Sequence, residues 1–468
     1  MAAVSMICVH ELHHEFCSYV FRDCNHSFCG RMLVACKNTS VYGFPSQNLH
    51  LYLQTFTAEM RIYFFIQLLL VLCTICQSQR TALDDNIGVY RNVREFALNI
   101  IGRTSTPGGW QLARARDQRK LQNIVSPNIP FPCALTNTRS PEPPTSVHKL
   151  RPGDIDVIAA MGDSLTAGFG AVATQFPHVV VENRGVSWSG GGQSSWREYL
   201  TLPNIIKVFN PNLIGYALSD SFTTHKESQL NVAEGLAMSA DMPFMAQVLI
   251  KRIKHDPRIN LKTHWKMISL LIGPNDFCSE MCYQSSPSSI LAKHRSDLIT
   301  VFRILRDNLP RTIVALIPPP NLKVLVEFTK RQPICDIAVD VECSCLFGLR
   351  WQWRKKEFYA IMREWQKIEE EVATLPEFQR EDFAIVLQPF TTNISFPVTT
   401  SGLTDFTYSS ADCFHLSQKG YARAANALWN NLMEPVGRKS RNWQNIFERF
   451  LCPTSKRPYI STMKNSIS

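Results

Sequence analysis

The chain has 468 residues, of which 45% are apolar and 19% charged, a composition typical of a globular protein that can bury a sizeable core. Its formal net charge of +10 is spread along the sequence without a long basic run. Because zinc-finger spacing is also missing from the basic regions, a nucleic-acid-binding function is disfavoured, and we expect no nucleic-acid partner.

Residues 1–59 show no clear helical or strand periodicity and are left unassigned. They contain the run HELHH from His10 to His14, which matches a zinc motif in which two histidines share one face of a helix. No third ligand follows at a useful spacing, and so short a run recurs by chance. We therefore expect no metal site in this segment.

A short targeting segment begins at Met60. Basic Arg61 precedes about fifteen apolar residues, which are followed by polar residues and small Ser78. This order predicts a signal peptide over residues 60–79, with a signal anchor or a core helix as the alternative. Cleavage near Ser78 would remove residues 1–59. We therefore expect a secreted protein, with membrane association as the alternative.

The cysteines downstream of this segment point to the same compartment. Eight of the 15 follow it, namely Cys133, Cys278, Cys282, Cys335, Cys343, Cys345, Cys413 and Cys452. An even number in a secreted chain predicts disulfide bonds, although the spacing leaves their pairing open. Asn393, in the sequon Asn-Ile-Ser, is an expected N-glycosylation site on a loop.

Residues 80–146 are expected to form a helical segment followed by a proline-rich linker. Six prolines fall within residues 126–147, and such a stretch cannot continue a helix or a central strand. We therefore expect a catalytic domain over residues 147–452 and a short tail over residues 453–468.

Beyond the linker, short apolar runs alternate with helical patterns. The expected strands are Ile155–Met161, Val179–Glu182, Asn212–Ala217, Trp265–Ile272, Arg311–Ile317 and Phe383–Leu387. The expected helices are Pro243–His255, Ser288–Asn308, Gln352–Ala373 and Ser417–Leu432. This alternation predicts an α/β fold with a central parallel sheet covered by helices on both faces.

Polar residues follow four of the predicted strands. Ser164 follows the first strand, the glycine run 190–192 follows the second, Asn275 follows the fourth, and Asp412 and His415 follow the last. Sites in open α/β sheets lie beyond the carboxyl ends of the strands. We therefore expect these groups to meet at one edge of the sheet.

Ser164, His415 and Asp412 have the chemical types of a nucleophile, its base and an orienting acid. A serine hydroxyl is a poor nucleophile at neutral pH and needs an adjacent base, whose tautomer an acid can hold. Taken singly, Ser164 or Asp412 is an ordinary helix N-cap and His415 an ordinary core or surface histidine. Their occurrence together favours a serine ester hydrolase that works without cofactor or metal.

The oxyanion of such a reaction needs preorganised donors. The Ser164 backbone N–H, a glycine N–H from residues 190–192 and the Asn275 side-chain amide are candidates, and Gly192 is preferred over Gly191. Taken alone, Asn275 is a turn residue and the glycines serve backbone flexibility.

The residues around these groups carry a family resemblance. Gly162-Asp-Ser-Leu165, the glycine block, Gly273-Pro-Asn-Asp276 and Asp412-Cys-Phe-His415 resemble the four blocks of the GDSL (SGNH) hydrolase family. The longer stretches 147–171, 184–192 and 412–437 resemble its phospholipase B branch. The resemblance covers about residues 130–465.

The resemblance implies a three-layer, flavodoxin-like fold and hydrolysis of phospholipids and lysophospholipids (phospholipase B, lysophospholipase or phospholipase A type) at a membrane surface, without metal. It assigns Ser164 as nucleophile, His415 as base, Asp412 as orienting residue, and Asn275 with a block-two glycine as oxyanion donors. The alternatives are an esterase for another acyl ester, such as a carbohydrate acetate or a retinyl ester, and a catalytically silent binding protein.

Three features depart from the branch pattern. The second block reads Gly-Gly-Gly-Gln over 190–193, where the branch has an aliphatic residue, two glycines and an aspartate. The chain shows one copy of the repeat and no C-terminal span, where membrane-associated members have several repeats and a span. Glu234 and Met238 stand where smaller residues are usual.

Overall fold

The computed structural model describes residues 82–466, with side chains from residue 87 onward. They belong to one compact unit, Gln79–Ser468. The HELHH run and the predicted signal peptide lie outside the described residues. Within residues 82–466, no helix combines the length and the apolar character needed to cross a membrane.

Four parallel strands form one sheet in the order β1-β2-β3-β4. They are β1 (Ile155–Gly162), β2 (Trp265–Leu271), β3 (Thr312–Leu316) and β4 (Phe383–Leu387). Each is an almost continuous apolar run, as expected of strands covered on both faces. Because all four run in the same direction, their carboxyl ends lie along one edge of the sheet.

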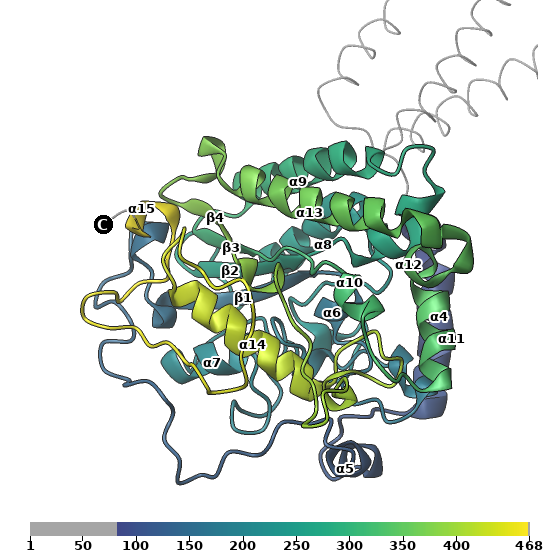
Figure 1. The fold of residues 1–468 in the computed structure, drawn as a ribbon. Helices are drawn as coiled ribbons and strands as arrows, with labels where there is room; N and C mark the ends of the chain where they lie inside the picture. Colours follow the sequence, from purple (N-terminus) through teal and green to yellow (C-terminus); the bar gives the residue numbers. More distant parts are fainter. Residues whose placement is uncertain (1–81, 467–468) are drawn as a thin grey trace, which may run out of the picture. The chain divides into compact units, whose positions relative to one another are not determined.

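Helices cover both faces of the sheet. The helices are α4 (Ala82–Ile101), α5 (Trp110–Asp117), α6 (Ser164–Ala167), α7 (Leu202–Phe209), α8 (Met242–His255), α9 (Ser289–Asn308), α10 (Lys323–Val326), α11 (Pro333–Glu342), α12 (Ser344–Phe347), α13 (Lys355–Ala373), α14 (Gln418–Met433) and α15 (Met463–Ser466). Figure 1 shows α8, α9 and α13 on one side of the strands and α7 and α14 on the other.

Successive residues of each strand enter two different cores. In β3, Ile313 and Ala315 pack into the core that includes α7 and α14, whereas Val314 and Leu316 pack into the core that includes α8, α9 and α13. Side chains of a strand point alternately to opposite faces, so each face is built from every second residue. The predicted three-layer α/β/α architecture is thereby confirmed.

The strand predicted at residues 179–182 is wrong. Residues Phe176–Val180 form a 3₁₀ helix instead. Pro177 occupies its first turn, where the missing N–H and the fixed φ of proline are tolerated. An apolar run of this length does not separate a strand from a short helix by periodicity.

The strand predicted at residues 212–217 is reduced to isolated bridges. Ile214 makes one parallel bridge to Val157 of β1. The next residue, Gly215, has a φ of +102°, which ends the extended backbone that continuous pairing requires.

Charged contacts tie α4 to the body of the unit. Arg91 and Arg94 of α4 both pair with Glu234, and Arg94 also pairs with Glu182. Glu182 pairs in turn with Arg184 at 2.6 Å, and both of these side chains are fully buried. The unusual carboxylate at position 234 is therefore the partner of two arginines from the N-terminal segment. The predicted domain boundary at residue 147 stays a prediction.

The eight downstream cysteines form four disulfide bonds, which confirms the expected pairing of all eight. The bonds are Cys133–Cys452, Cys278–Cys343, Cys282–Cys345 and Cys335–Cys413. Three of them end within residues 335–345, so α11 and α12 are linked covalently to the segment after β2 and to the segment before α14.

Asn393 is exposed on the segment that follows β4. Its backbone N–H donates to the carbonyl of Arg441 at 2.8 Å, which fixes the backbone and leaves the side chain at the surface. The position suits a glycosylation acceptor, and modification of Asn393 stays a prediction.

Candidate active site

Ser164 stands at a sharp turn from strand to helix. β1 ends at Gly162, whose φ is +146°, and a Cβ at this position would collide with the carbonyl oxygen of Leu271. Asp163 caps α6 by accepting a hydrogen bond from the amide of Leu165 at 2.9 Å. Ser164 is the first residue of α6 and therefore lies at the carboxyl edge of the sheet.

His415 links Ser164 to Asp412. Nε2 of His415 lies 2.7 Å from Oγ of Ser164, and Nδ1 lies 2.6 Å from Oδ2 of Asp412. In a neutral imidazole that donates from Nδ1, Nε2 is an acceptor, so the Ser164 hydroxyl donates to it. The structure thus brings together the three predicted residues, two of which are 251 positions apart.

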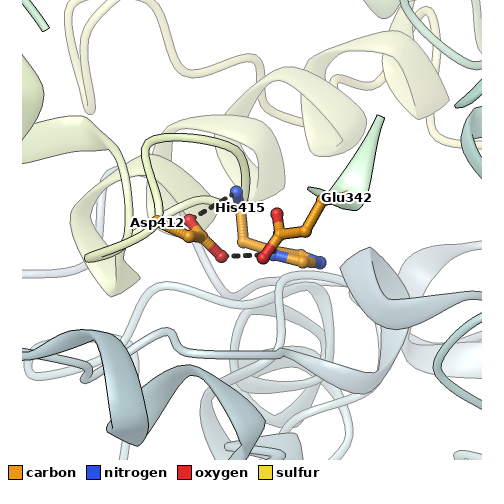
Figure 2. Close-up of side chains that lie close together, drawn as sticks. All are labelled: Glu342, Asp412 and His415. Atoms are coloured by element: carbon orange, nitrogen blue, oxygen red, sulfur yellow. Dashed lines mark hydrogen bonds and ion pairs between the residues drawn. The ribbon is translucent and has the colours of Figure 1, made fainter. Parts of the chain in front are cut away.

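Asp412 is held by its own loop. Its Oδ1 accepts the backbone amides of Phe414 at 2.9 Å and His415 at 3.0 Å, while Oδ2 meets the imidazole (Figure 2). Burial raises the pKa of the Asp412 carboxyl, but the positive charge of His415 and these hydrogen bonds outweigh burial and lower it. Asp412 is therefore ionised beside the imidazole.

The environment favours the protonated form of His415. Burial lowers the pKa of its imidazole, but the charge and the hydrogen bond of Asp412 oppose burial and raise the pKa to about 9. The Phe169 ring stacks on His415 with centroids 5.6 Å apart, and the Phe414 ring meets it edge-on at 5.2 Å. These rings keep water from two sides of the base.

Asp163 serves the geometry of the turn. It is fully buried, and burial raises the pKa of its carboxyl to about 7, while the hydrogen bond from Leu165 opposes the rise. Its Oδ2 has no hydrogen-bond partner. Asp163 is thus a cap whose ionisation is suppressed by the apolar surroundings of Ser164.

Asn275 follows the end of β2, next to the strand that delivers Ser164. Its side-chain amide donates to the carbonyl of Ala237 at 2.9 Å. A primary amide has two N–H groups, so this bond leaves one for a second acceptor. Asn275 keeps the donor capacity expected of an oxyanion residue.

The backbone amide of Gly192 is already hydrogen-bonded within the protein. Its amide donates to the carbonyl of Ala217 at 2.8 Å, and a Cβ at this position would collide with the ring of Tyr216. The amide of Gly191 is likewise used, by the carbonyl of Ser187 at 2.9 Å. In this conformation both amides are engaged elsewhere, and Gly192 permits close packing. Gly192 as an oxyanion donor stays a prediction.

An apolar pocket adjoins these groups. Its lining includes the chain neighbours of three predicted site residues: Leu165 beside Ser164, Pro274 beside Asn275, and Phe414 and Leu416 on either side of His415. Other lining residues come from distant segments, among them Trp188, Leu322, Val324, Phe390, Phe396 and Trp443. The site therefore joins a polar triad to a surface suited to an apolar chain.

Trp188 contributes to this pocket and to the nucleophile turn. Its indole N–H donates to the carbonyl of Leu165 at 3.1 Å, and its side chain is buried. The buried ring makes Trp188 a packing residue of the pocket. The bond to Leu165 ties that packing to the turn that carries Ser164.

Glu342 is a site residue that the sequence did not indicate. Together with Asp412 and His415 it brings three atoms of metal-ligand type within 4.8 Å of one another. Both ring nitrogens of His415 are already hydrogen-bonded, to Ser164 and Asp412, so the group does not fit a metal centre and Glu342 is a carboxyl group beside the triad. No local pattern marks Glu342, because only tertiary packing and the disulfides bring α11 to the triad.

Known proteins are similar to this chain in sequence. Residues 158–428 match the family model of GDSL-like lipases and acylhydrolases. Membrane-associated phospholipase B1 of Homo sapiens is 39% identical over 327 residues, which cover 69% of this chain and 22% of that protein. The Mus musculus protein of the same name is 36% identical over 374 residues, covering 75% of this chain and 24% of that protein.

The chain thus matches less than a quarter of the length of these relatives. Among solved structures, an extracellular lipase of Streptomyces rimosus aligns with 57% of this chain and 94% of its own, at 16% identity and a TM-score of 0.27.

The triad predicts a distinctive labelling pattern with a fluorophosphonate, which reacts with an activated serine. Labelling of Ser164 should accelerate as pH rises from 6 towards 9, because the raised pKa of His415 makes the neutral base scarce at lower pH. Ser164→Ala should abolish labelling, and His415→Ala should slow it by about 10³-fold or more. Mass spectrometry of the labelled peptide measures both.

The melting temperatures of both variants serve as the control for folding. A labelling rate that reaches its plateau near pH 6 would contradict the raised pKa of His415. Labelling of wild type at a different serine would contradict the assignment of Ser164.

Proposed function

Because this chain belongs to the GDSL-like lipase and acylhydrolase family, we propose that it hydrolyses carboxylic esters of phospholipids and lysophospholipids. The observation that carries the proposal is the hydrogen-bonded chain Ser164–His415–Asp412 next to an apolar pocket. The names of the phospholipase B1 relatives support the lipid substrate.

In the proposed reaction, Ser164 forms an acyl-enzyme. As Oγ attacks the ester carbonyl carbon, its proton passes to Nε2 of His415, and Asp412 stabilises the resulting imidazolium. The free N–H of Asn275 and the Ser164 amide stabilise the oxyanion. The imidazolium then protonates the leaving alcohol, which is a lysophospholipid when the substrate is a phospholipid and the glycerophospho group when it is a lysophospholipid.

Hydrolysis of the acyl-enzyme repeats these steps with water. Neutral His415 removes a proton from water as the oxygen attacks the acyl carbon. The tetrahedral intermediate collapses, Oγ of Ser164 takes the proton back from His415, and the fatty acid leaves. The chain's own side chains supply every proton transfer in this scheme.

The apolar pocket is the proposed site of the fatty acyl chain. It contacts the residues on either side of His415 and the residue after Ser164, so a chain lying in it would place its carboxyl end at the nucleophile. Each buried methylene stabilises binding by about 0.8 kcal/mol. A long acyl chain therefore gains more from this pocket than an acetyl group does.

A lipid surface is the proposed peripheral partner. Large apolar side chains between residues 337 and 353 are 64% to 86% exposed, namely Ile337, Val341, Leu349 and Trp353. Ile337 and Val341 are four residues apart on α11 and thus share one face of that helix. This exposed stretch adjoins the triad through Glu342, so adsorption there would present the site to lipid.

Secretion is proposed on separate grounds. The four disulfide bonds suit an oxidising compartment, since such bonds are rare in the cytosol. The signal peptide predicted at residues 60–79 agrees with this compartment.

Two substrates separate the proposed function from its alternatives. Wild type should release fatty acid from phosphatidylcholine vesicles and little acetate from an acetylated sugar, because only the lipid fills the apolar pocket. Ser164→Ala should lower fatty acid release by about 10³-fold or more. Ser296→Ala, which removes an exposed hydroxyl from α9, is the matched control and should keep full activity.

Faster release of acetate than of fatty acid would support an esterase for another ester. A folded wild type that neither hydrolyses these substrates nor reacts with fluorophosphonate would support a silent binding protein.

The pocket predicts that α10 controls acyl chain length. Val324→Trp places a large ring in the pocket lining and should lower kcat/KM for a palmitoyl ester about tenfold or more relative to a butyryl ester. Val326→Trp is the control, because Val326 is equally half-buried on α10 but does not line the pocket. Equal losses for both esters would place the acyl chain elsewhere.

The exposed stretch predicts the response to vesicles. The double change Leu349→Asp and Trp353→Asp should weaken sedimentation with phosphatidylcholine vesicles at least tenfold, because each charge opposes transfer into lipid. Hydrolysis of a soluble short-chain ester should stay unchanged. Ile129→Asp, at another exposed apolar residue, is the control. Unchanged sedimentation of the double variant would exclude this surface.

A further inference from the structure

Glu342 lies beside the base of the triad. Its Oε2 is 3.9 Å from Nδ1 of His415, the same nitrogen that meets Asp412. This oxygen is buried and has no hydrogen-bond partner. Figure 2 shows the carboxyl groups of Glu342 and Asp412 reaching the imidazole from two different segments of the chain.

Two disulfide bonds fix Glu342 in this place. Cys343, the next residue, is bonded to Cys278, which follows the turn of Asn275. Cys335, at the other end of α11, is bonded to Cys413, which lies between Asp412 and His415. The helix that carries Glu342 is thus covalently joined to both loops that carry the predicted chemistry.

We propose that Glu342 is a positioning residue for the base: its carboxyl group adds a second negative charge on the Nδ1 side of His415 and sets the pH at which His415 acts. The proposal rests on the proposed hydrolase function and deepens it. It requires no contact between Glu342 and the substrate, since Glu342 acts through the imidazole.

Glu342 ionises in the pH range in which His415 also titrates. Burial raises the pKa of its carboxyl to about 8, the charge of Asp412 adds to the rise, and His415 opposes it. Glu342 therefore keeps its proton near neutral pH and loses it as the pH rises through about 8. The carboxylate formed favours the imidazolium, so it raises the pKa of His415.

Other charged or titratable groups also face this cluster. Asp163, at the start of α6, acts on His415 in the same direction as Glu342. Lys120 donates to the carbonyl of Ser409 at 2.8 Å and lies within the field of Asp412. Tyr421 of α14 is buried near Asp163 and Asp412. Burial is the main cause that raises the pKa of its phenol, and the charges of both carboxylates raise it further.

The carboxylate of Glu342 affects the step in which His415 takes the proton of Ser164 and becomes positively charged. As Ser164 attacks, its O–H bond breaks, an N–H bond forms at Nε2 of His415, and the oxygen electron pair forms the new bond to carbon. The imidazolium is then flanked by Asp412 and by ionised Glu342. Two unit charges about 4 Å apart interact by about 1 kcal/mol even in water, so removal of one is measurable.

The test is the pH profile of kcat/KM for a soluble short-chain ester. Glu342→Gln keeps the shape of the side chain and removes its charge. The acid limb of the profile should move to lower pH by about 0.7 unit or more, and the alkaline plateau should fall about fivefold. The opposite signs of these changes would not result from a loosened structure, which lowers activity at every pH.

Two further variants serve as controls. Asp340→Asn removes an exposed charge from the same helix and should leave both the limb and the plateau unchanged. Glu342→Asp keeps a carboxylate and should restore most of the limb position, and it also carries the test if the glutamine variant fails to fold. A glutamine variant whose acid limb coincides with wild type overturns the proposal.

The experiments distinguish failure of the role proposed for Glu342 from failure of the proposed hydrolase function. If wild type hydrolyses no ester, the hydrolase function fails, and the pH profile of fluorophosphonate labelling at Ser164 then tests Glu342 by the same shift. If wild type is active and the limb does not move, only the role of Glu342 fails.

Discussion

The hydrogen bond between the Asp412 carboxylate and the His415 imidazole is the interaction on which the site depends. A buried carboxylate and a buried imidazolium each lose hydration, and the loss is offset only with close geometry and further hydrogen bonds. The 2.6 Å contact and two backbone amides on Asp412 meet that requirement. In the neutral imidazole this bond also leaves Nε2 as an acceptor, so Asp412 orients the Ser164 hydroxyl through His415 without contacting it.

Distant parts of the chain hold this bond in register with the nucleophile. β1 and its tight turn at Gly162 deliver Ser164, while the loop before α14 delivers the base. The N-terminal segment reaches that loop too, since Lys120 donates to the carbonyl of Ser409. A disulfide bond joins α11 to the same loop through Cys413. Precision at the triad thus arises from long-range contacts on a rigid sheet.

The sequence predicted the centre of the fold better than its edge. The four continuous apolar runs became β1 to β4, because burial on both faces leaves a strong pattern. The runs at 179–182 and 212–217 carry weak patterns, and Pro177 and Gly215 decided their backbone. Ser164, Asp412 and His415 were predictable from order and chemical type. The partner of the Gly192 amide and the place of Glu342 were not, since an amide's partner and a helix docked by disulfides depend on tertiary structure.

Burial raises the pKa of the carboxyl groups in the site and, taken alone, lowers the pKa of the His415 imidazole. It raises the pKa of Glu342 to about 8, whereas for His415 the charge of Asp412 overcomes it and raises the pKa to about 9. A base strong enough to take the proton of Ser164 is therefore largely protonated at neutral pH. Glu342 stays neutral near pH 7 and adds nothing to this cost there. Above about pH 8 its carboxylate raises the pKa of His415 further, so the site gains a stronger base at the expense of a larger protonated fraction.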